Sequence, residues 1–207
     1  MLGRFHDAAA TTGTMIVPAV GWDSLPSDIL VYLANKTLKC VDGPTADISQ
    51  STTAWLVKSG GVSGGSINTL ITTIEDVPMD KLVASSADYA LSPITGLPSA
   101  RKIPQLFYTL PLSGNPPVVG CYWIMEGINK AIIQRSWGLN QMSHRQGKKE
   151  MELATYGPEF QYSEFLVMSS KLKAVFVTLL MVFVWIGLVF VPPVSTWEVG
   201  RIEIGLI

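Results

Sequence analysis

Hydrophobic and polar positions along the chain predict helices and strands in mixed order. Four segments are predicted to be helices: residues 5–12, 27–38, 66–76 and 122–137. In three of them apolar residues recur at intervals of three and four, which places them on one helix face. These residues are Ile29, Leu30, Leu33 and Ala34 in the second segment, Ile67, Leu70, Ile71 and Ile74 in the third, and Ile124, Met125, Ile128 and Ile132 in the fourth. We expect the last four to point into the core.

Shorter apolar runs predict strands at residues 15–19, 52–58 and 105–110. Gly13 is expected to end the first helix, and residues 42–50 are expected to form a loop. Residues 77–117 contain many of the 13 prolines, so we expect them to be mostly extended. This order of elements indicates an α+β fold.

The segment that joins the first strand to the second helix concentrates polar side chains. It reads Gly21-Trp22-Asp23-Ser24-Leu25-Pro26-Ser27-Asp28. Ser24 is suited to cap the helix, Pro26 to stand in its first turn, and Asp28 to complement the helix dipole. From spacing alone, the segment is either an ordinary helix start or a ligand site at the end of a strand.

A second polar turn, Gly60-Gly61-Val62-Ser63-Gly64-Gly65-Ser66, precedes the third predicted helix. Free backbone N–H groups at a helix start can hold an anion. No Lys follows Gly65, so the turn is not a Walker loop, and its spacing does not match Gly-x-Gly-x-x-Gly. A tight connection that needs glycine for positive φ is the alternative.

An uncharged apolar run of roughly 18 residues, 174–191, lies near the end of the chain. As a helix it would be about 27 Å long, which nearly matches a bilayer core of about 30 Å. Lys171 and Lys173 precede it, so the positive-inside rule places the body of the protein in the cytosol. Pro192 and Pro193 end the run and also allow a hairpin or an interfacial insertion. The run predicts membrane association, and a helix buried in the core or in a dimer interface is the alternative.

Composition narrows the range of functions. The 207 residues include 15 basic and 16 acidic side chains, a net charge of −1, so we expect no nucleic-acid partner. Cys40 and Cys121 are too far apart in sequence for a Cys-x-x-Cys site, and a reducing, intracellular compartment fits them best. With only His6 and His144, we expect no metal site and no Ser-His-Asp triad.

Four stretches together resemble a known family. Residues 21–28, preceded by Phe5-His6-Asp7-Ala8-Ala9, resemble its Gly-Phe-Asp-Ser-Ile-Pro-Ser-Asp segment, and residues 60–66 resemble its Gly-Gly-x-Ser-Gly-Gly-Thr turn. Residues 132–136 and 156–162 resemble its Val-Val-Arg-Arg-Ser and Tyr-Gly-x-x-Phe-x-Tyr stretches. In this order they are similar to the saccharopine dehydrogenase-like oxidoreductases, which include the trans-acting enoyl reductases of mycobacteria, over roughly residues 4–192.

The chain also departs from the family pattern. Trp22, Leu25 and Ser66 are conservative replacements, whereas Trp137 stands where the family usually has Asn. Family members begin with a Rossmann domain that carries Gly-x-Gly-x-x-Gly, and this chain lacks that motif. The resemblance therefore implies the C-terminal portion of such a protein. Residues 1–38 would be the remnant of the last α/β unit of the Rossmann domain, 39–170 a second substrate and dimerisation domain, and 171–207 a hydrophobic membrane-associating helix with a short tail.

The resemblance implies an oxidoreductase that uses NAD or NADP to reduce a lipid-like or amino-acid-derived substrate. It makes Asp23, Ser24 and Ser27 the candidate catalytic residues. The glycine turn would face the substrate through Ser63, Gly64, Gly65 and Ser66. No cofactor-binding residue is assigned, and we expect that this chain alone does not bind the dinucleotide.

The expected partners are a membrane or lipid surface and a second copy of the chain, as a homodimer. The expected location is a lipid droplet or a mitochondrial or other internal membrane. The alternative function is that of a non-catalytic, membrane-anchored binding or scaffold protein, which the missing phosphate loop favours.

Overall fold

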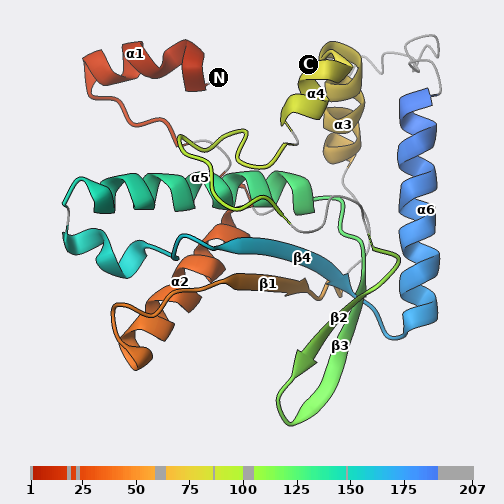
Figure 1. The fold of residues 1–207 in the computed structure, drawn as a ribbon. Coiled ribbons are helices and arrows are strands. Elements are labelled where there is room, and N and C mark those ends of the chain that lie inside the picture. The colour runs from red at the N-terminus through yellow and green to blue at the C-terminus, as the bar shows by residue number, and fades with distance from the viewer. Residues whose placement is uncertain are drawn as a thin grey trace, which may run out of the picture.

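A four-stranded mixed sheet lies at the centre of the fold. The computed structural model describes residues 2–17, 20–21, 24–58, 64–85, 87–99, 105–147 and 149–190. The strands are β1 (Gln50–Trp55), β2 (Tyr108–Leu112), β3 (Asn115–Cys121) and β4 (Gln161–Val167), in the order β1-β4-β3-β2 (Figure 1). β1 runs parallel to β4, and the other two pairs are antiparallel. Helices combined with this sheet give the mixed class that the sequence predicts.

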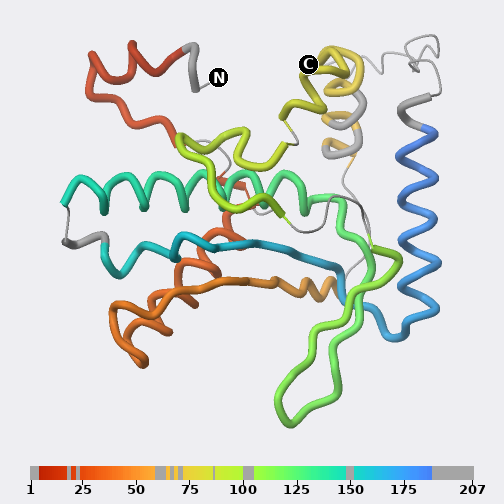
Figure 2. The backbone as a smooth tube through the Cα atoms, in the orientation of Figure 1, coloured from red at the N-terminus to blue at the C-terminus, as the bar shows by residue number. Residues whose placement is uncertain are grey.

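The register of β4 determines which side chains share a face. Thr53 lies opposite Glu164 across the β1–β4 pair, and Tyr162 stands two residues before Glu164, so the three side chains share one face. On its other edge β4 pairs with β3 only at Gly120↔Val167 and Cys121↔Leu166. The β2–β3 hairpin extends away from the helices beyond this pairing (Figure 2). Within the described structure, the first half of β4 is therefore paired with β1 but not with β3.

Two long helices form the layer next to the sheet. α2 (Leu25–Asp42) packs against α5 (Glu126–Arg145), α5 packs against β4, and the short 3₁₀ helix η1 (Lys149–Ala154) contacts both helices. The core cluster lies among these elements and consists of Val31, Tyr89, Ile133, Trp137, Tyr156, Phe160 and Tyr162. Trp137 anchors it, because its ring lies 5.3 Å from that of Tyr89 and its Nε1–H donates to the Gly157 carbonyl at 2.7 Å.

α2 buries a face other than its apolar one. Its buried residues follow one another at intervals of four and are Ser27, Val31, Asn35 and Lys39. Lys39 Nζ donates to the Glu152 carbonyl at 2.9 Å and Asn35 Nδ2 to the Leu153 carbonyl at 2.9 Å. η1 thus satisfies the polar groups, which is the condition for burying them. The predicted apolar stripe faces outward instead, with Ile29, Leu30 and Leu33 between 44% and 51% exposed.

For the next long helix, α5, the prediction of which residues point into the core is wrong. α5 begins at Glu126, four residues later than expected, and Ile124 and Ile128 are exposed. Its buried face follows Asn129, Ile133 and Trp137, again at intervals of four. A polar interaction at Asn129, described below, sets the rotation of this helix.

The N-terminal region differs from the expected Rossmann remnant. α1 (Leu2–Thr12) forms and ends at Gly13, where φ is +66°, as predicted. Residues 15–17 of the predicted strand belong to no strand, and Met15 is 84% exposed. Residues 18 and 19 lie outside the described residues. Without that strand, the described residues do not form the expected α/β unit.

The middle of the chain contains two further helices. α3 (Gly64–Asp76) matches the predicted helix closely, whereas α4 (Met79–Ser85) lies in a segment that we expected to be extended. α4 follows Pro78 and consists of seven consecutive residues without Gly or Pro, Met-Asp-Lys-Leu-Val-Ala-Ser. Pro at a helix start is compatible with this, because its missing N–H would have no partner there.

α6 (Lys171–Phe190) is the helix predicted from the apolar run. It packs against β3 through Ala174 and Thr178, which are 0% and 2% exposed, and the Thr178 hydroxyl accepts from the Tyr122 N–H at 3.1 Å. Phe176 and Phe183 on its other sides are 68% and 73% exposed. Among the described residues, no helix combines the length and apolarity that a membrane crossing requires. The predicted membrane-spanning helix therefore has no support in the described structure.

Candidate functional site

A fully buried carboxylate on β4 is the centre of the polar interior. Glu164 is 0% exposed. Its Oε2 accepts from the Tyr162 hydroxyl at 2.7 Å, from Trp55 Nε1 at 3.1 Å and from the Ser27 hydroxyl at 3.2 Å. Its Oε1 accepts from Asn129 Nδ2 at 2.8 Å. No ion pair with Glu164 is found among the described residues, so these four neutral donors replace the water that the carboxylate loses on burial.

The network joins both helices to the sheet. Ser27 comes from α2, Asn129 from α5, and both are 0% exposed. Asn129 Nδ2 also lies 3.4 Å from the Ser27 hydroxyl. Asn129 Oδ1 is buried and has no partner among the described residues. We name Glu164, Tyr162, Trp55, Ser27 and Asn129 the carboxylate network.

The sequence-predicted catalytic residues fall in different environments. Ser27 belongs to the carboxylate network, where its hydroxyl binds Glu164 inside the protein. Ser24 is 7% exposed and occupies the N-cap position of α2, without a capping bond from its side chain in the described structure. Asp23 lies outside the described residues. The catalytic role of these three residues stays a prediction.

The described part of the predicted substrate-binding turn lies away from the carboxylate network. Gly64 and Gly65 begin α3 and are exposed, and α3 lies apart from β4 (Figure 1). Ser63 lies outside the described residues, as does the side chain of Ser66. The structure thus brings none of the described residues of this turn to the carboxylate network.

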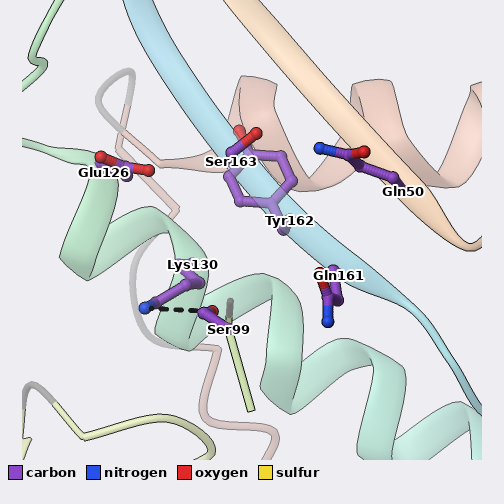
Figure 3. A pocket seen from close by; sticks show the side chains of 7 residues that line it. All are labelled: Gln50, Ser99, Glu126, Lys130, Gln161, Tyr162 and Ser163. Atoms are coloured by element: carbon purple, nitrogen blue, oxygen red, sulfur yellow. Dashed lines mark hydrogen bonds between the residues drawn. The ribbon is translucent and has the colours of Figure 1, made fainter. Parts of the chain in front are cut away.

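A cleft of about 190 Å³ opens beside the first half of β4 (Figure 3). Side chains from α5, β1 and β4 and from the loop before β2 surround it. Its lining residues are Gln50, Ser99, Glu126, Lys130, Gln161, Tyr162 and Ser163. Tyr162 belongs to both the cleft and the carboxylate network, so the network supports one wall of the cleft.

Lys130 is held at the cleft by two groups. Its Nζ forms an ion pair with Asp88 at 2.7 Å and donates to the Ser99 hydroxyl at 3.4 Å, the bond drawn in Figure 3. Asp88 in turn accepts from the Ser99 N–H at 2.6 Å and from its hydroxyl at 3.2 Å. Burial by itself would raise the pKa of Asp88, but the bonds from Lys130 and Ser99 and the charge of Lys130 hold it below its usual value. The Lys130 ammonium is therefore fixed in position at the cleft.

Glu126 stands one helical turn before Lys130 on α5. Burial raises the pKa of its carboxyl above the usual value, although the charge of Lys130 and a hydrogen bond from the Glu164 N–H act in the opposite direction. The Tyr108 hydroxyl donates to its Oε2 at 3.4 Å. This bond from Tyr108 favours the charged form, but burial is the larger effect. A carboxyl group whose neutral form is favoured by burial can donate a proton or a hydrogen bond to a ligand.

Sequence reasoning missed this site, although one signal for it was present. Glu126 and Lys130 are four residues apart, a spacing that brings two helical side chains together. The apolar pattern predicts the helix but gives no role to either residue. In the structure the neighbouring Arg135 takes no part in the cleft, because its Nη1 donates to the Leu91 carbonyl at 2.8 Å.

The described residues do not fit a metal ion or the pyrophosphate of a dinucleotide. Within them no three His, Cys, Asp or Glu side chains gather in a way that could hold a metal. The turn before α3 lacks the spacing of a dinucleotide-binding loop, and Gly64 begins that helix at an exposed position. The chemistry that this part of the chain offers is therefore that of the cleft: a carboxyl group, an ammonium, two amides and three hydroxyls.

Comparison with known proteins indicates distant relatives among oxidoreductases. The chain is 29% identical over 176 residues to a protein of Mycobacterium tuberculosis H37Rv named as a proposed trans-acting enoyl reductase. It is 26% identical over 181 residues to proteins of Mycobacterium bovis BCG and M. tuberculosis H37Rv named trans-acting enoyl reductase. The matches cover 82% of this chain but only 39% of the relatives' length.

No protein-family profile matches the chain, and no solved structure matches it. The similarity to enoyl reductases supports a relationship to oxidoreductases. The finer resemblance to the saccharopine dehydrogenase-like family stays a prediction.

Proposed function

We propose that this chain forms the substrate-binding part of a nicotinamide-dependent reductase that acts on a lipid-like carbonyl compound. One observation carries the proposal: in a cleft beside β4, the carboxyl group of Glu126 and the ammonium of Lys130 stand one helical turn apart. A reductase of an unsaturated carbonyl compound needs a proton donor and a cation near the carbonyl group. The names of the relatives support the same class of reaction.

A non-catalytic scaffold has less support. The relatives are named as enzymes, and a scaffold gives no reason for a carboxyl group with a raised pKa next to a fixed ammonium. The proposal assigns binding of the nicotinamide cofactor to a region other than the described residues. Dependence on NAD or NADP is part of the proposal and follows from the general chemistry of the reductase class.

The test uses a fusion of the complete chain with the part of the M. tuberculosis relative that lies outside the matched 176 residues. We expect oxidation of NADPH that depends on added crotonyl thioester. Glu126→Gln should lower kcat by about a hundredfold, the usual contribution of a general acid. The matched control is Glu159→Gln on the surface of the chain, which should leave kcat unchanged. A fusion that binds NADPH and the thioester but does not oxidise NADPH would contradict the proposal.

We also propose that α6 brings the protein to the surface of an internal membrane and that two copies associate there. Support comes from its apolar side chains: Phe176, Leu179 and Phe183 are 68%, 53% and 73% exposed. Lys171 and Lys173 at the start of the helix are suited to anionic lipid headgroups. This arrangement is an interfacial insertion, which requires no crossing of the bilayer.

A further inference from the structure

Lys130 has one hydrogen-bond donor that finds no acceptor in the part of the chain that the structure describes. A Lys ammonium carries three N–H donors. Asp88 accepts one at 2.7 Å and Ser99 accepts a second at 3.4 Å. No described residue accepts the third, and Lys130 lines the cleft. Because Asp88 and Ser99 fix the ammonium from one side, the third N–H is available to a ligand in the cleft.

The other lining groups indicate that the ligand group is uncharged. The charge of Lys130 is already balanced by Asp88, so an anionic ligand would bring a further negative charge close to the Asp88 carboxylate. Gln50, Gln161 and the serines of the cleft offer neutral amides and hydroxyls. A carbonyl oxygen fits this environment, because it is a neutral acceptor that an ammonium can bind.

The size of the cleft limits how much of the ligand enters. Its 190 Å³ equals the liquid volume of about six water molecules. That space accommodates a carbonyl group with a short part of an acyl chain, while the rest of a longer ligand would lie outside the cleft. The cleft is thus suited to recognise the functional group of the ligand.

We propose that Lys130 binds the carbonyl oxygen of an acyl ligand in the cleft and polarises that carbonyl, while Asp88 and Ser99 hold its ammonium in place. This inference rests on the proposed function, since it assigns the carbonyl-binding residue to the same site. Binding of a cation draws electron density towards the oxygen. In a conjugated acyl group this makes the β-carbon more electrophilic, which is the carbon that a reductase attacks.

The experiment measures binding to the 207-residue chain rather than turnover, so that its result is independent of the nicotinamide cofactor. The probe is the crotonyl thioester of N-acetylcysteamine with a ¹³C label at the thioester carbonyl, followed by NMR. We expect the carbonyl resonance to move downfield on binding. In Lys130→Met that movement should be lost and Kd should rise about tenfold or more, the effect of losing one charge-assisted hydrogen bond. Lys130→Arg should keep part of both effects.

Lys36→Met is the matched control, because Lys36 is an exposed lysine on α2, and it should leave the resonance and Kd unchanged. If Lys130→Met does not fold, Lys130→Arg and Asp88→Asn decide, since each should reduce the carbonyl shift in a folded chain. A full shift in these variants, or no binding of the probe to the unmodified chain, would overturn the inference. Turnover by the fusion tests the proposed function separately.

Discussion

Replacement of Glu164 separates the contribution of the carboxylate network from that of packing. Glu164→Leu keeps a side chain of similar size on β4 but removes both acceptor oxygens. It leaves four donors without their acceptor inside the protein: Trp55 Nε1, Asn129 Nδ2 and the hydroxyls of Ser27 and Tyr162. Glu164→Gln keeps one oxygen and replaces the other by an NH₂ group.

The hydrogen bonds of Glu164 give a separate expected loss of unfolding free energy for each of the two variants. A buried donor without a partner costs about 1–3 kcal/mol. The two hydroxyls can rotate, whereas the N–H groups of Trp55 and Asn129 are left facing the apolar Leu side chain, so Glu164→Leu should cost about 4 kcal/mol in unfolding free energy. In Glu164→Gln the remaining oxygen can accept from the three donors that bind Oε2 in the wild-type chain. Its NH₂ group then faces Asn129, whose Oδ1 has no partner within the described part of the chain and can accept if the Asn129 amide turns. We expect this variant to cost only about 1 kcal/mol.

Urea denaturation followed by tryptophan fluorescence and by circular dichroism measures both values. Gln161→Leu on the same strand is the control, because its side chain is partly exposed and makes one bond of 3.4 Å to the Pro98 carbonyl. It should change stability by less than about 0.5 kcal/mol. Equal losses in the Gln and Leu variants, or an unchanged stability of Glu164→Leu, would refute the account of the network.

Three further changes test other parts of the structure. Burial raises the pKa of Asp28 above its usual 3.8, and the hydrogen bond from Ser136 has a weaker opposite effect. Because the folded chain holds this proton more tightly than the unfolded chain, the wild-type chain loses stability as the pH rises through the folded pKa of Asp28. Asp28→Asn should therefore stabilise the chain more at about pH 7 than at about pH 4, as urea titrations at both pH values would measure. Trp137→Phe removes the bond to the Gly157 carbonyl and should lower unfolding free energy by about 2 kcal/mol in the same assay, and a loss below about 0.5 would contradict the anchoring role. Phe183→Ser should leave stability within about 0.5 kcal/mol but reduce flotation of the chain with anionic vesicles, and undiminished flotation would exclude this face of α6 as the lipid contact.

Local sequence patterns were sufficient for several helices. Gly13 marks the end of α1, and the uncharged apolar run of α6 has no residue that interrupts a helix. Both signals depend only on neighbours along the chain. β4 was missed because Gln161, Ser163 and Glu164 make it polar in sequence, although four of its seven residues are buried. Buried polar residues in a strand give no alternating pattern, so periodicity alone does not detect them.

The orientation of the helices could not be predicted, because apolar spacing identifies a face but not the element that covers it. α2 has the predicted apolar face, yet it buries Ser27, Asn35 and Lys39, whose partners come from β4 and η1. Those partners lie more than 100 residues further along the chain. A polar side chain therefore gives no sign of burial until the acceptor that makes its burial possible is known.

The candidate site could not be predicted for the same reason: its residues come from segments that lie far apart in sequence. Its acidic and basic groups, Asp88, Glu126 and Lys130, lie in separate segments or one helical turn apart. The β4 residues of the cleft come more than 30 positions after Lys130, whereas Gln50 of β1 comes before all three groups. The parallel pairing of β1 with β4 brings Gln50 beside Gln161, and the packing of α5 on β4 brings Glu126 and Lys130 to the same cleft. Of these relations only the spacing of Glu126 and Lys130 is visible locally. Because the same spacing occurs on many solvent-exposed helices, it becomes evidence for a site only when a buried network such as that of Glu164 is found beside it.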